Sequence, residues 1–582
     1  MTTTETPDLE ILLGDPHAAE PYSYASIADD DDARRLSPFA ENVLAEWGAA
    51  AEFVPVDLGG RWADTSDLVT RLRPIFRRDP AVGLGYGLTT LMSAVNVWTG
   101  GDDAQKRDVA RRLLAGERIA VGFHELDHGN DLLNNECAAE FDGTSWRVRG
   151  VKQVVNNIDR AESILIMAKT REGTTARQFS LLLWNKSPES AANADTSRRL
   201  LTAGMRGCVI GAGRFDGVAV PPENLIGGDG AAVETALKAF QITRAVIPAL
   251  AVGAVEAALH ETIRYGRDRE LYGGTVLDIP HARALVATAL ADMLVADAMS
   301  AATVRALHLS PRECFVLTAA CKYLSPRLLI EAMQQISVVA GSTFYARIEP
   351  FEIIEKIVRD LAVVPIGHAG ETSCLLTILP NLPAWARRAE KTPAADLSLT
   401  DLSGDTVLPS LDFGSLTLGA GSSDPLGAVF EDPRLSEALA SSTTELKSLV
   451  DALAAGYARE RAAARALRPD ELTTDAPAAS FDVARRISLY LAAGAVIGVW
   501  LNANASDRKR DAGIAGDPLA LQACLLRIQG RLSGRQRPLP DAVVERLVAH
   551  AETSVDARQS MGLHAVSVYP GITGNVSTTP NP

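Results

Sequence analysis

The sequence predicts a mainly helical protein with a β-domain at its centre, in the order α–β–α, followed by an appended helical domain. Apolar residues recur at helical spacing in residues 36–118 and again in 231–395, which we interpret as a four-helix bundle. Short apolar runs bounded by Gly and Pro fill 119–230 and predict strands. Ala- and Leu-rich helical segments return in 430–565. Because helices and strands are segregated rather than alternating, a doubly wound sheet is excluded.

Size and charge narrow the class of protein. The chain has 582 residues, which is more than one ordinary core holds, and its 47% hydrophobic and 22% charged residues are typical of a soluble globular protein. The net charge of −15 argues against a nucleic-acid partner. Six cysteines without disulfide or metal-ligand spacing predict reduced thiols, no metal site and a cytoplasmic location.

Three further segments are expected to lie outside the packed domains. Residues 1–35 are polar, include the acidic run Asp29–Asp32, and are predicted to be a flexible N-terminus without the basic-then-apolar order of a signal peptide. Residues 396–429 are rich in Gly, Ser, Asp and Pro and predict a linker. Residues 566–582 predict a disordered tail.

Several motifs in the β-domain and in the helices after it occur in a fixed order. They are IAVGFHELDHGND from residue 119, GVKQVVNN from 150, GMRGCVIGAGRFDGVAVPPENLIG from 204, YGRDRELYGG from 265, VVAGSTF from 338 and IVRDLAVVPIGHAGETS from 357. In order and spacing they resemble the motifs of the acyl-CoA dehydrogenase family of flavoproteins over about residues 36–390. In length and helicity, the C-terminal extension is similar to that of the long-chain members.

The resemblance implies an FAD cofactor and a substrate that is an acyl thioester, oxidised to its α,β-enoyl form. It also implies a homo-oligomer, a dimer or a tetramer, because Arg269 and Tyr272 should reach the FAD of a neighbouring subunit. Val154 stands where the family usually has Trp. The residues that the resemblance places at the cofactor are His124, Glu125, Gly129, Asn130, Asn156, Asn157, Arg269, Tyr272, Gly341 and Ser342.

The family removes the substrate α proton with a Glu, and this chain has another residue at that place. Counting without gaps from the Arg-Asp pair of the last motif gives His368, whereas counting back from the end of the motif leaves Glu371 as the nearest carboxylate. In the other position that some members use, Thr243 precedes Arg244, and we assign both to substrate binding. We expect His368 to face the substrate as the base, and Glu371 to lie at the start of the next helix.

Three functions remain open at this point. The first is an FAD-dependent α,β-dehydrogenase or oxidase of a thioester of CoA or acyl carrier protein, with an electron-transfer flavoprotein or oxygen as electron acceptor. The second is a non-catalytic subunit of a heteromeric acyl-CoA dehydrogenase. The third is a flavin-dependent monooxygenase on the same fold. Bound flavin would count against the second, and the identity of the reductant would separate the other two.

Overall fold

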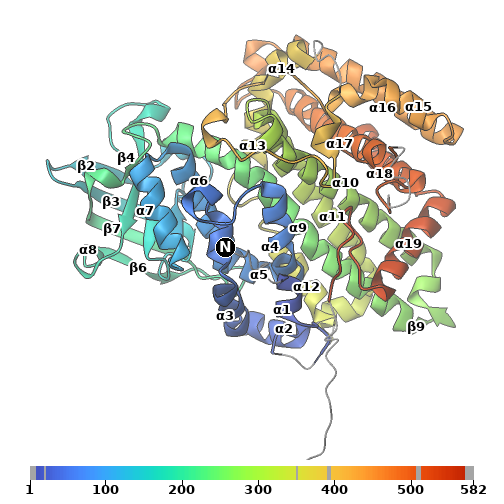
Figure 1. Ribbon diagram of the computed structural model, residues 1–582, viewed down its shortest axis with the longest axis horizontal. Helices are drawn as coiled ribbons and strands as arrows, with labels where there is room; N and C mark the ends of the chain where they lie inside the picture. Colours follow the sequence, from blue (N-terminus) through green and yellow to red (C-terminus); the bar gives the residue numbers. More distant parts are fainter. Residues whose placement is uncertain are drawn as a thin grey trace, which may run out of the picture.

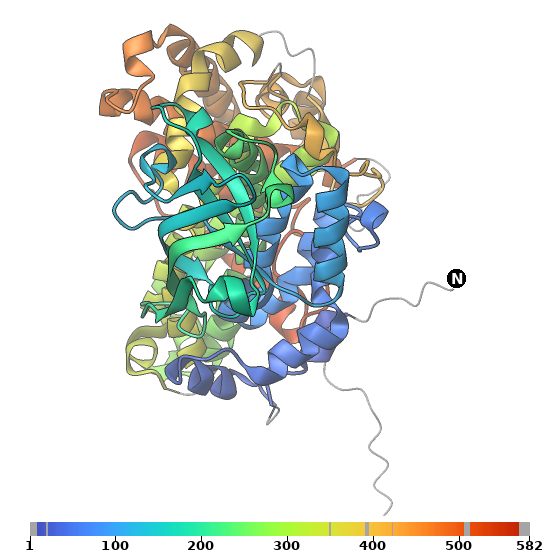
Figure 2. The ribbon, with the colours of Figure 1, turned by 90° about the vertical axis from the view of Figure 1, so that its left-hand side faces the viewer.

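The computed structural model describes residues 8–18, 21–348, 351–389, 395–421, 423–505 and 513–569. A β-domain lies at one end of the molecule and a helical bundle lies next to it, with the appended helices on the far side of the bundle (Figure 1). The N-terminal helices lie beside the sheet (Figure 2). The predicted α–β–α order with an appended helical domain is confirmed.

The N-terminal domain packs its helices against both the sheet and the bundle. Its longest helix, α4, is capped by the Asp64 side chain and buries one face against α9 of the bundle. A π-helical turn at Gly83–Leu88 precedes α6, which packs against the first strand. The helices of this domain are α3 (Pro38–Trp47), α4 (Thr65–Arg78), α6 (Thr89–Gly100) and α7 (Asp103–Leu114).

The β-domain is an eight-stranded mixed sheet in the order β6-β7-β3-β2-β4-β5-β8, with β1 paired to β4. The predicted hairpin lies between β2 and β3, where Gly143 has φ +97° and Asp142 accepts hydrogen bonds from the next turn residues. The strands are β1 (Ile119–Gly122), β2 (Ala138–Phe141), β3 (Trp146–Asn156), β4 (Ser163–Lys169), β5 (Phe179–Asn185), β6 (Ala194–Arg199), β7 (Ile210–Val220) and β8 (Leu225–Ile226).

Three long helices form the centre of the bundle, and a short loop and two short helices close its end beside the sheet. The long helices pack on one another and are buried on most faces. They are α9 (Ala232–Asp268), α10 (Pro280–Leu309) and α11 (Cys314–Ala346), followed by α12 (Glu352–Leu361), α13 (Glu371–Ile378) and α14 (Leu382–Ala389). The loop between α12 and α13 carries the proposed catalytic segment.

The appended domain packs on α10 and α11 through α17, α18 and α19. Its helices are α15 (Pro433–Leu439), α16 (Thr444–Ala466), α17 (Ala478–Ala503), α18 (Pro518–Ser533) and α19 (Asp541–Asp556). Among the described residues, α9, α10 and α17 are long and apolar enough to cross a membrane, by length and composition only. Their most apolar windows are 100%, 78% and 83% buried within the protein, respectively.

Two of the segments expected to be loose are packed. In the N-terminus, α1 (Leu9–Leu13) and α2 (Tyr24–Asp32) contribute to the core, so the flexible segment predicted for residues 1–35 is corrected over the part that the structure describes. The physical reason is that the acidic run is neutralised across the fold: Asp31 pairs with Arg359 at 2.8 Å and Asp32 with Arg347 at 2.9 Å. The sequence analysis placed these carboxylates in a flexible segment.

The predicted linker contains no long helix, but it lies against the bundle. Its Leu399 and Leu416 are buried, and the Ser398 carbonyl accepts a hydrogen bond from Arg305 of α10. The predicted tail from 566 falls mostly outside the described residues. The last described residues, Val568 and Tyr569, are buried, and the Tyr569 hydroxyl lies 3.0 Å from that of Tyr24.

Candidate functional site

A cavity of about 310 Å³ lies where the N-terminal domain, the sheet and the bundle meet. Its walls are mostly apolar, which suits a ligand with a large hydrophobic part. The N-terminal domain contributes Phe76, Pro80, Leu84, Leu88, Thr89 and Met92; the β-domain and its loops Val121, His124, Glu125, Leu126, Gly129, Asn130, Val154, Asn156, Met205 and Ile210; and the bundle Ile247, Ala251, Leu361, Val363, Val364, Ile366, Gly367 and His368.

Several residues with strained backbones lie at this cavity. Three of its non-glycine lining residues have left-handed backbones, with φ of +57° at Val154, +50° at Met205 and +48° at His368. Asn157 and Ala369, next to the lining residues in sequence, have φ of +58° and +69°. A β-branched residue with positive φ is a genuine outlier, and each such residue costs on the order of 1–3 kcal/mol. Strain of this kind persists mainly where a site requires it, so the cavity is the candidate functional site.

His368 faces the cavity from the loop between α12 and α13. Its side chain is 9% exposed, its ring meets the ring of Phe240 edge-on at a centroid distance of 4.6 Å, and its Nε2 has no hydrogen-bond partner. Burial lowers the pKa of His368 well below 6.5, and His124, Lys322 and Arg244 lower it further. His368 is therefore a neutral imidazole whose buried Nε2 has no partner within the described residues.

Glu371 lies in a different place. It is the first residue of α13, and its carboxylate pairs with Arg327 at 2.6 Å. It is not among the residues that line the cavity. Arg359 and Asp360, from which the sequence count began, are also held in ion pairs: Arg359 with Glu355 and Asp31, and Asp360 with Lys356 at 2.6 Å. Within this segment, His368 is the titratable side chain presented to the cavity.

His124 and Glu125 line the cavity from the segment directly after β1. His124 Nδ1 donates to the Gly129 carbonyl over 3.1 Å, so its Nε2 carries the free lone pair, and burial lowers the pKa of His124. Glu125 forms an ion pair with Lys152 at 2.7 Å and accepts hydrogen bonds from the backbone N–H groups of Glu136 and Cys137. These contacts hold the pKa of Glu125 low. Glu125 therefore holds together the segments that form this wall of the cavity and does not act as a free acid or base.

The two asparagines predicted to bind cofactor connect the sheet to the π-helical turn. Asn156 donates to Thr89 Oγ1 at 2.7 Å, and Asn157 donates to the Gly85 carbonyl. The Oδ1 atoms of both have no partner, and Asn156 lines the cavity. The cavity also reaches Gly129, where φ is +56°, and the exposed Asn130. This side of the cavity therefore offers an unpaired carbonyl oxygen and an exposed amide to a ligand.

The other four predicted cofactor residues lie elsewhere. Arg269 is exposed, and Tyr272 is 97% exposed with φ +56°. Gly341 interrupts α11 with φ +57° and ψ −131°, and Ser342 after it is exposed. None of the four lines the cavity. Their exposure is compatible with the predicted contact to a neighbouring subunit but does not bring them to this site.

Thr243 and Arg244 are fully buried in α9 behind His368. Thr243 Oγ1 donates to the Phe240 carbonyl, and Arg244 Nη2 donates to Thr377 Oγ1 at 3.1 Å. Sequence reasoning missed Lys322 of α11, whose Nζ donates to the carbonyls of Val364 and Gly367 and so supports the loop that carries His368. The available signal was a lone lysine in the apolar run FVLTAACKYLS.

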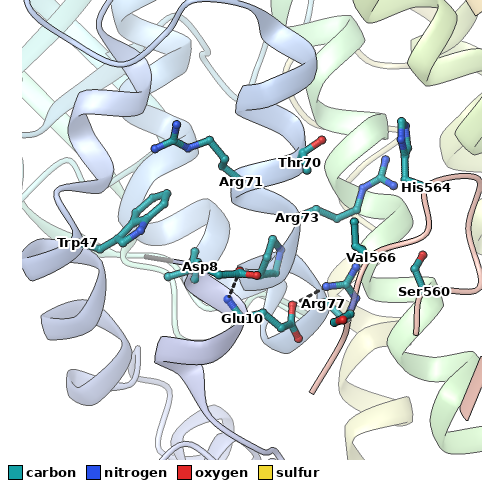
Figure 3. A pocket seen from close by; sticks show the side chains of 13 residues that line it. Asp8, Glu10, Trp47, Thr70, Arg71, Arg73, Arg77, Ser560, His564 and Val566 are labelled. Carbon is teal, nitrogen blue, oxygen red and sulfur yellow. Dashed lines mark hydrogen bonds and ion pairs between the residues drawn. The ribbon is translucent and has the colours of Figure 1, made fainter. Parts of the chain in front are cut away.

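Other cavities contain charges that are already compensated. One of about 220 Å³ lies between α4, the N-terminus and residues 560–567 (Figure 3). On its wall Arg77 pairs with Glu10 at 2.6 Å and with Glu256 at 2.7 Å, and Arg73 pairs with Asp297 at 2.8 Å. A neighbouring cavity of about 470 Å³ shares Arg73 with it. Because these arginines have carboxylate partners, we interpret this region as part of the packing between domains.

Comparison with known proteins finds two family models that match this chain. Residues 120–218 match the family model "Acyl-CoA dehydrogenase, middle domain", and residues 228–379 match "Acyl-CoA dehydrogenase, C-terminal domain". The two matched regions are thus similar in sequence to the middle and C-terminal domains of acyl-CoA dehydrogenases. They cover the β-domain, most of the bundle and the loop of His368.

Curated relatives match at low identity. The chain is 28% identical over 261 residues to a (2S)-methylsuccinyl-CoA dehydrogenase of Cereibacter sphaeroides, a match that covers 44% of this chain and about half, 47%, of that protein. It is 24% identical over 352 residues to a probable acyl-CoA dehydrogenase of Mycobacterium tuberculosis, covering 60% of this chain and 86% of that one.

Solved structures show the same fold. Butyryl-CoA dehydrogenase from Megasphaera elsdenii matches with a TM-score of 0.56 at 18% identity, over 64% of this chain and 96% of that one. The prolyl acyl carrier protein oxidase AnaB matches with a TM-score of 0.55 at 16% identity, over 60% and 91% of the respective chains. The appended helical domain lies beyond the residues that the family models match.

The family indicates FAD as the cofactor, and the residues of the cavity fit such a group. An apolar wall suits a flat ring system, and the unpaired Oδ1 of Asn156 can accept from a ring N–H. His124 has its Nε2 lone pair free for a donor. Val154, at the position of the family's Trp, is 44% exposed and offers less contact area than an indole.

Proposed function

We propose that this protein is an FAD-dependent oxidoreductase of acyl thioesters, and that His368 is the group that meets the substrate's α carbon. The single observation behind this proposal is the position of His368, which faces an apolar cavity with its Nε2 unpaired. FAD, when bound, would accept hydride from the β carbon. His368 would take the α proton on Nε2, since a neutral imidazole is in the correct state for a base.

The test compares two substitutions in flavin-loaded protein. His368→Ala should lower turnover of an acyl thioester at least about a hundredfold, the usual size of a lost general base. Glu371→Ala should leave turnover close to wild type, because Glu371 pairs with Arg327 outside the cavity. Flavin content, followed by visible absorbance, should be unchanged in both. Reversed effects would make Glu371 the base, and no effect from either would end the dehydrogenase proposal.

The pH dependence supplies a second test. An ordinary histidine base has a pKa of about 6.5 and loses activity as it protonates. Since burial and the nearby cations lower the pKa of His368, it stays neutral in more acidic solution. We expect turnover to stay level between about pH 8 and about pH 6, where an unperturbed histidine would already lose activity.

A flavin-dependent monooxygenase is the second candidate, and one observation favours it. Among the described residues that line the cavity, Glu125 is the one with a carboxyl group, and it is paired with Lys152. The cavity therefore has no free carboxylate, within these residues, to act as a base. Hydroxylation with oxygen needs no base strong enough to remove an α proton. Reduction of the bound flavin by an acyl thioester under anaerobic conditions would support the dehydrogenase. Reduction by an external reductase alone, followed by an oxygen-dependent product, would support the monooxygenase. A purified protein without flavin would favour the non-catalytic subunit.

We also propose a cytoplasmic homo-oligomer that passes electrons to an electron-transfer flavoprotein or to oxygen. The support for the oligomer is an exposed apolar surface: Tyr272 is 97%, Tyr345 is 88%, Val338 is 61% and Ile348 is 54% exposed. Thr343 bonds to Tyr265, which ties the end of α11 to the end of α9. Tyr345→Glu should weaken self-association in sedimentation experiments. A wild-type monomer of 61.8 kDa at micromolar concentration would contradict this proposal.

A further inference from the structure

Two buried cations lie behind the loop that carries His368. Arg244 of α9 is 0% exposed, and its Nε and Nη1 have no hydrogen-bond partner. Lys322 of α11 is 1% exposed, and its Nζ donates to the carbonyls of Val364 and Gly367, the latter at 3.0 Å. Both cations are therefore held in place, and two nitrogens of Arg244 carry N–H groups that have no hydrogen-bond acceptor.

Among the residues that the structure describes, no carboxylate pairs with either charge. In the part of the chain that the structure describes, neither Arg244 nor Lys322 forms an ion pair, and the groups that favour their charged forms are thiols. Arginine does not deprotonate in proteins, so burial cannot neutralise it. Burial lowers the pKa of Lys322 to about 8, which leaves it mostly charged at neutral pH. A buried charge without a counter-charge is strongly unfavourable, and such a site favours the entry of an anion.

The positive region adjoins the cavity. Arg244, Ile247 and Ala251 are spaced to lie on one face of α9, and the last two line the cavity. Arg244 lies over the Phe240 ring at 5.9 Å, and the same ring contacts His368 at 4.6 Å. Val364 and Gly367, whose carbonyls hold the Lys322 ammonium, are themselves part of the cavity wall. One layer of residues therefore separates the two cations from a ligand at His368.

We infer that the His368 end of the cavity is a subsite for a carboxylate carried by the ligand. The carboxylate would be balanced by Arg244 and Lys322, both of which otherwise remain buried without a counter-charge. This deepens the proposed function, on which it rests for the identity of the cavity as the substrate site. The ligand class is then an acyl thioester that carries a second, free carboxylate close to the α carbon that meets His368.

The experiment uses the full-length protein as purified and two probes of equal size, hexanoate and hexanamide. Calorimetry should give a dissociation constant for hexanoate at least about tenfold lower than for hexanamide, since only the carboxylate gains from the two cations. Equal affinities, or no binding of either probe, would show that the inference is wrong.

Substitutions identify the groups responsible. Arg244→Met and Lys322→Met should each weaken hexanoate at least about tenfold and leave hexanamide unchanged, because truncating one partner of a buried charge pair costs at least that much. Arg327→Met is the matched control, since Arg327 carries the same charge, pairs with Glu371 and does not line the cavity. The control should bind hexanoate as wild type does. If Arg327→Met loses as much affinity for hexanoate as the other two variants, the overall charge of the protein explains the binding, and the subsite is rejected.

Cys374 provides the counter-test, because its thiol interacts electrostatically with both Arg244 and Lys322. If a thiolate there already balanced the charge, Cys374→Ala would bind hexanoate far more tightly than wild type, and the inference would fail. Flavin content is measured in the same samples. If the flavin-loaded protein shows no preference for hexanoate over hexanamide, the carboxylate subsite alone is contradicted. If the protein prefers hexanoate but cannot bind flavin, only the proposed redox function is contradicted.

Discussion

Helix α9 passes through two buried clusters of charge that are built in opposite ways. Near its C-terminal half, Glu256 accepts from Arg77, from Ser560 and from two backbone N–H groups, so every charge there has a partner. Three turns earlier, Arg244 is buried as deeply without a carboxylate. The first cluster joins the N-terminal helices to the C-terminal segment and is structural. The second adjoins a strained cavity and is kept at a cost in stability, which is typical of a functional site.

The largest effect should come from breaking the compensated cluster. Arg77→Met leaves Glu10 and Glu256 buried without their guanidinium, which should cost about 3–5 kcal/mol of stability. The measurement is the urea midpoint followed by circular dichroism. Arg111→Met is the control, since Arg111 is exposed, pairs with Asp108 on the surface, and should leave the urea midpoint close to that of wild type. A loss from Arg77→Met as small as that of the control would contradict the comparison.

Lowering the pH should reduce the stability contributed by both clusters. Burial lowers the pKa of His260, in the compensated cluster, from 6.5 to about 4, although Glu256 acts to raise it. A histidine with a depressed folded pKa adds stability above its unfolded pKa of about 6.5 and loses it as pH falls towards the folded value. From pH 7 to pH 5, His260 alone should cost about 2 kcal/mol.

Thermal unfolding of wild type and His260→Gln at both pH values checks this prediction. The variant should lose less stability on acidification than wild type, because one group that protonates only on unfolding is gone. His368, with its pKa also lowered by burial, should act in the same direction in the second cluster. An identical loss in wild type and in His260→Gln would mean that His260 is already protonated in the folded protein.

The sharpest contrast between the clusters concerns Arg244→Met. Removing an uncompensated buried charge leaves no orphaned carboxylate, so stability should stay within about 1 kcal/mol of wild type or rise. The opposite sign is expected for Arg77→Met, and both are measured by the same urea midpoint. A loss above about 3 kcal/mol in Arg244→Met would show that Arg244 has a counter-charge in the folded protein.

The smallest effect concerns the exposed ion pair beside the second cluster. Glu371→Gln removes the contact with Arg327, whose side chain is 43% exposed, and should cost less than about 1 kcal/mol. The thermal midpoint should therefore move little. High salt should remove most of the difference between variant and wild type, since an exposed pair is screened. A loss that persists at high salt would place Glu371 in a buried role.

The sequence by itself determined the order of the helical and strand regions and the segment that carries the candidate base. Hydrophobic periodicity predicted the α–β–α order, because a helix and a strand that bury one face need periods of 3.6 and 2. The Asp142–Gly143 turn predicted its hairpin because Gly adopts positive φ at no steric cost. The count along the catalytic segment proposed His368, and the structure places His368 at the cavity and Glu371 away from it.

Only the tertiary structure decided which charges are balanced. Asp31 finds Arg359 across 328 residues, which folds a segment that looks solvated in sequence. Lys322 lies 42 residues before the Val364 carbonyl that it holds, and the local pattern around it predicts only a buried helix. The electrostatic free energy of a charge depends on its distance to other charges and on its burial, and both are set by how remote elements pack. The sequence could therefore name Arg244 and His368, but the absence of a carboxylate beside Arg244 became visible only in the folded chain, within the residues described.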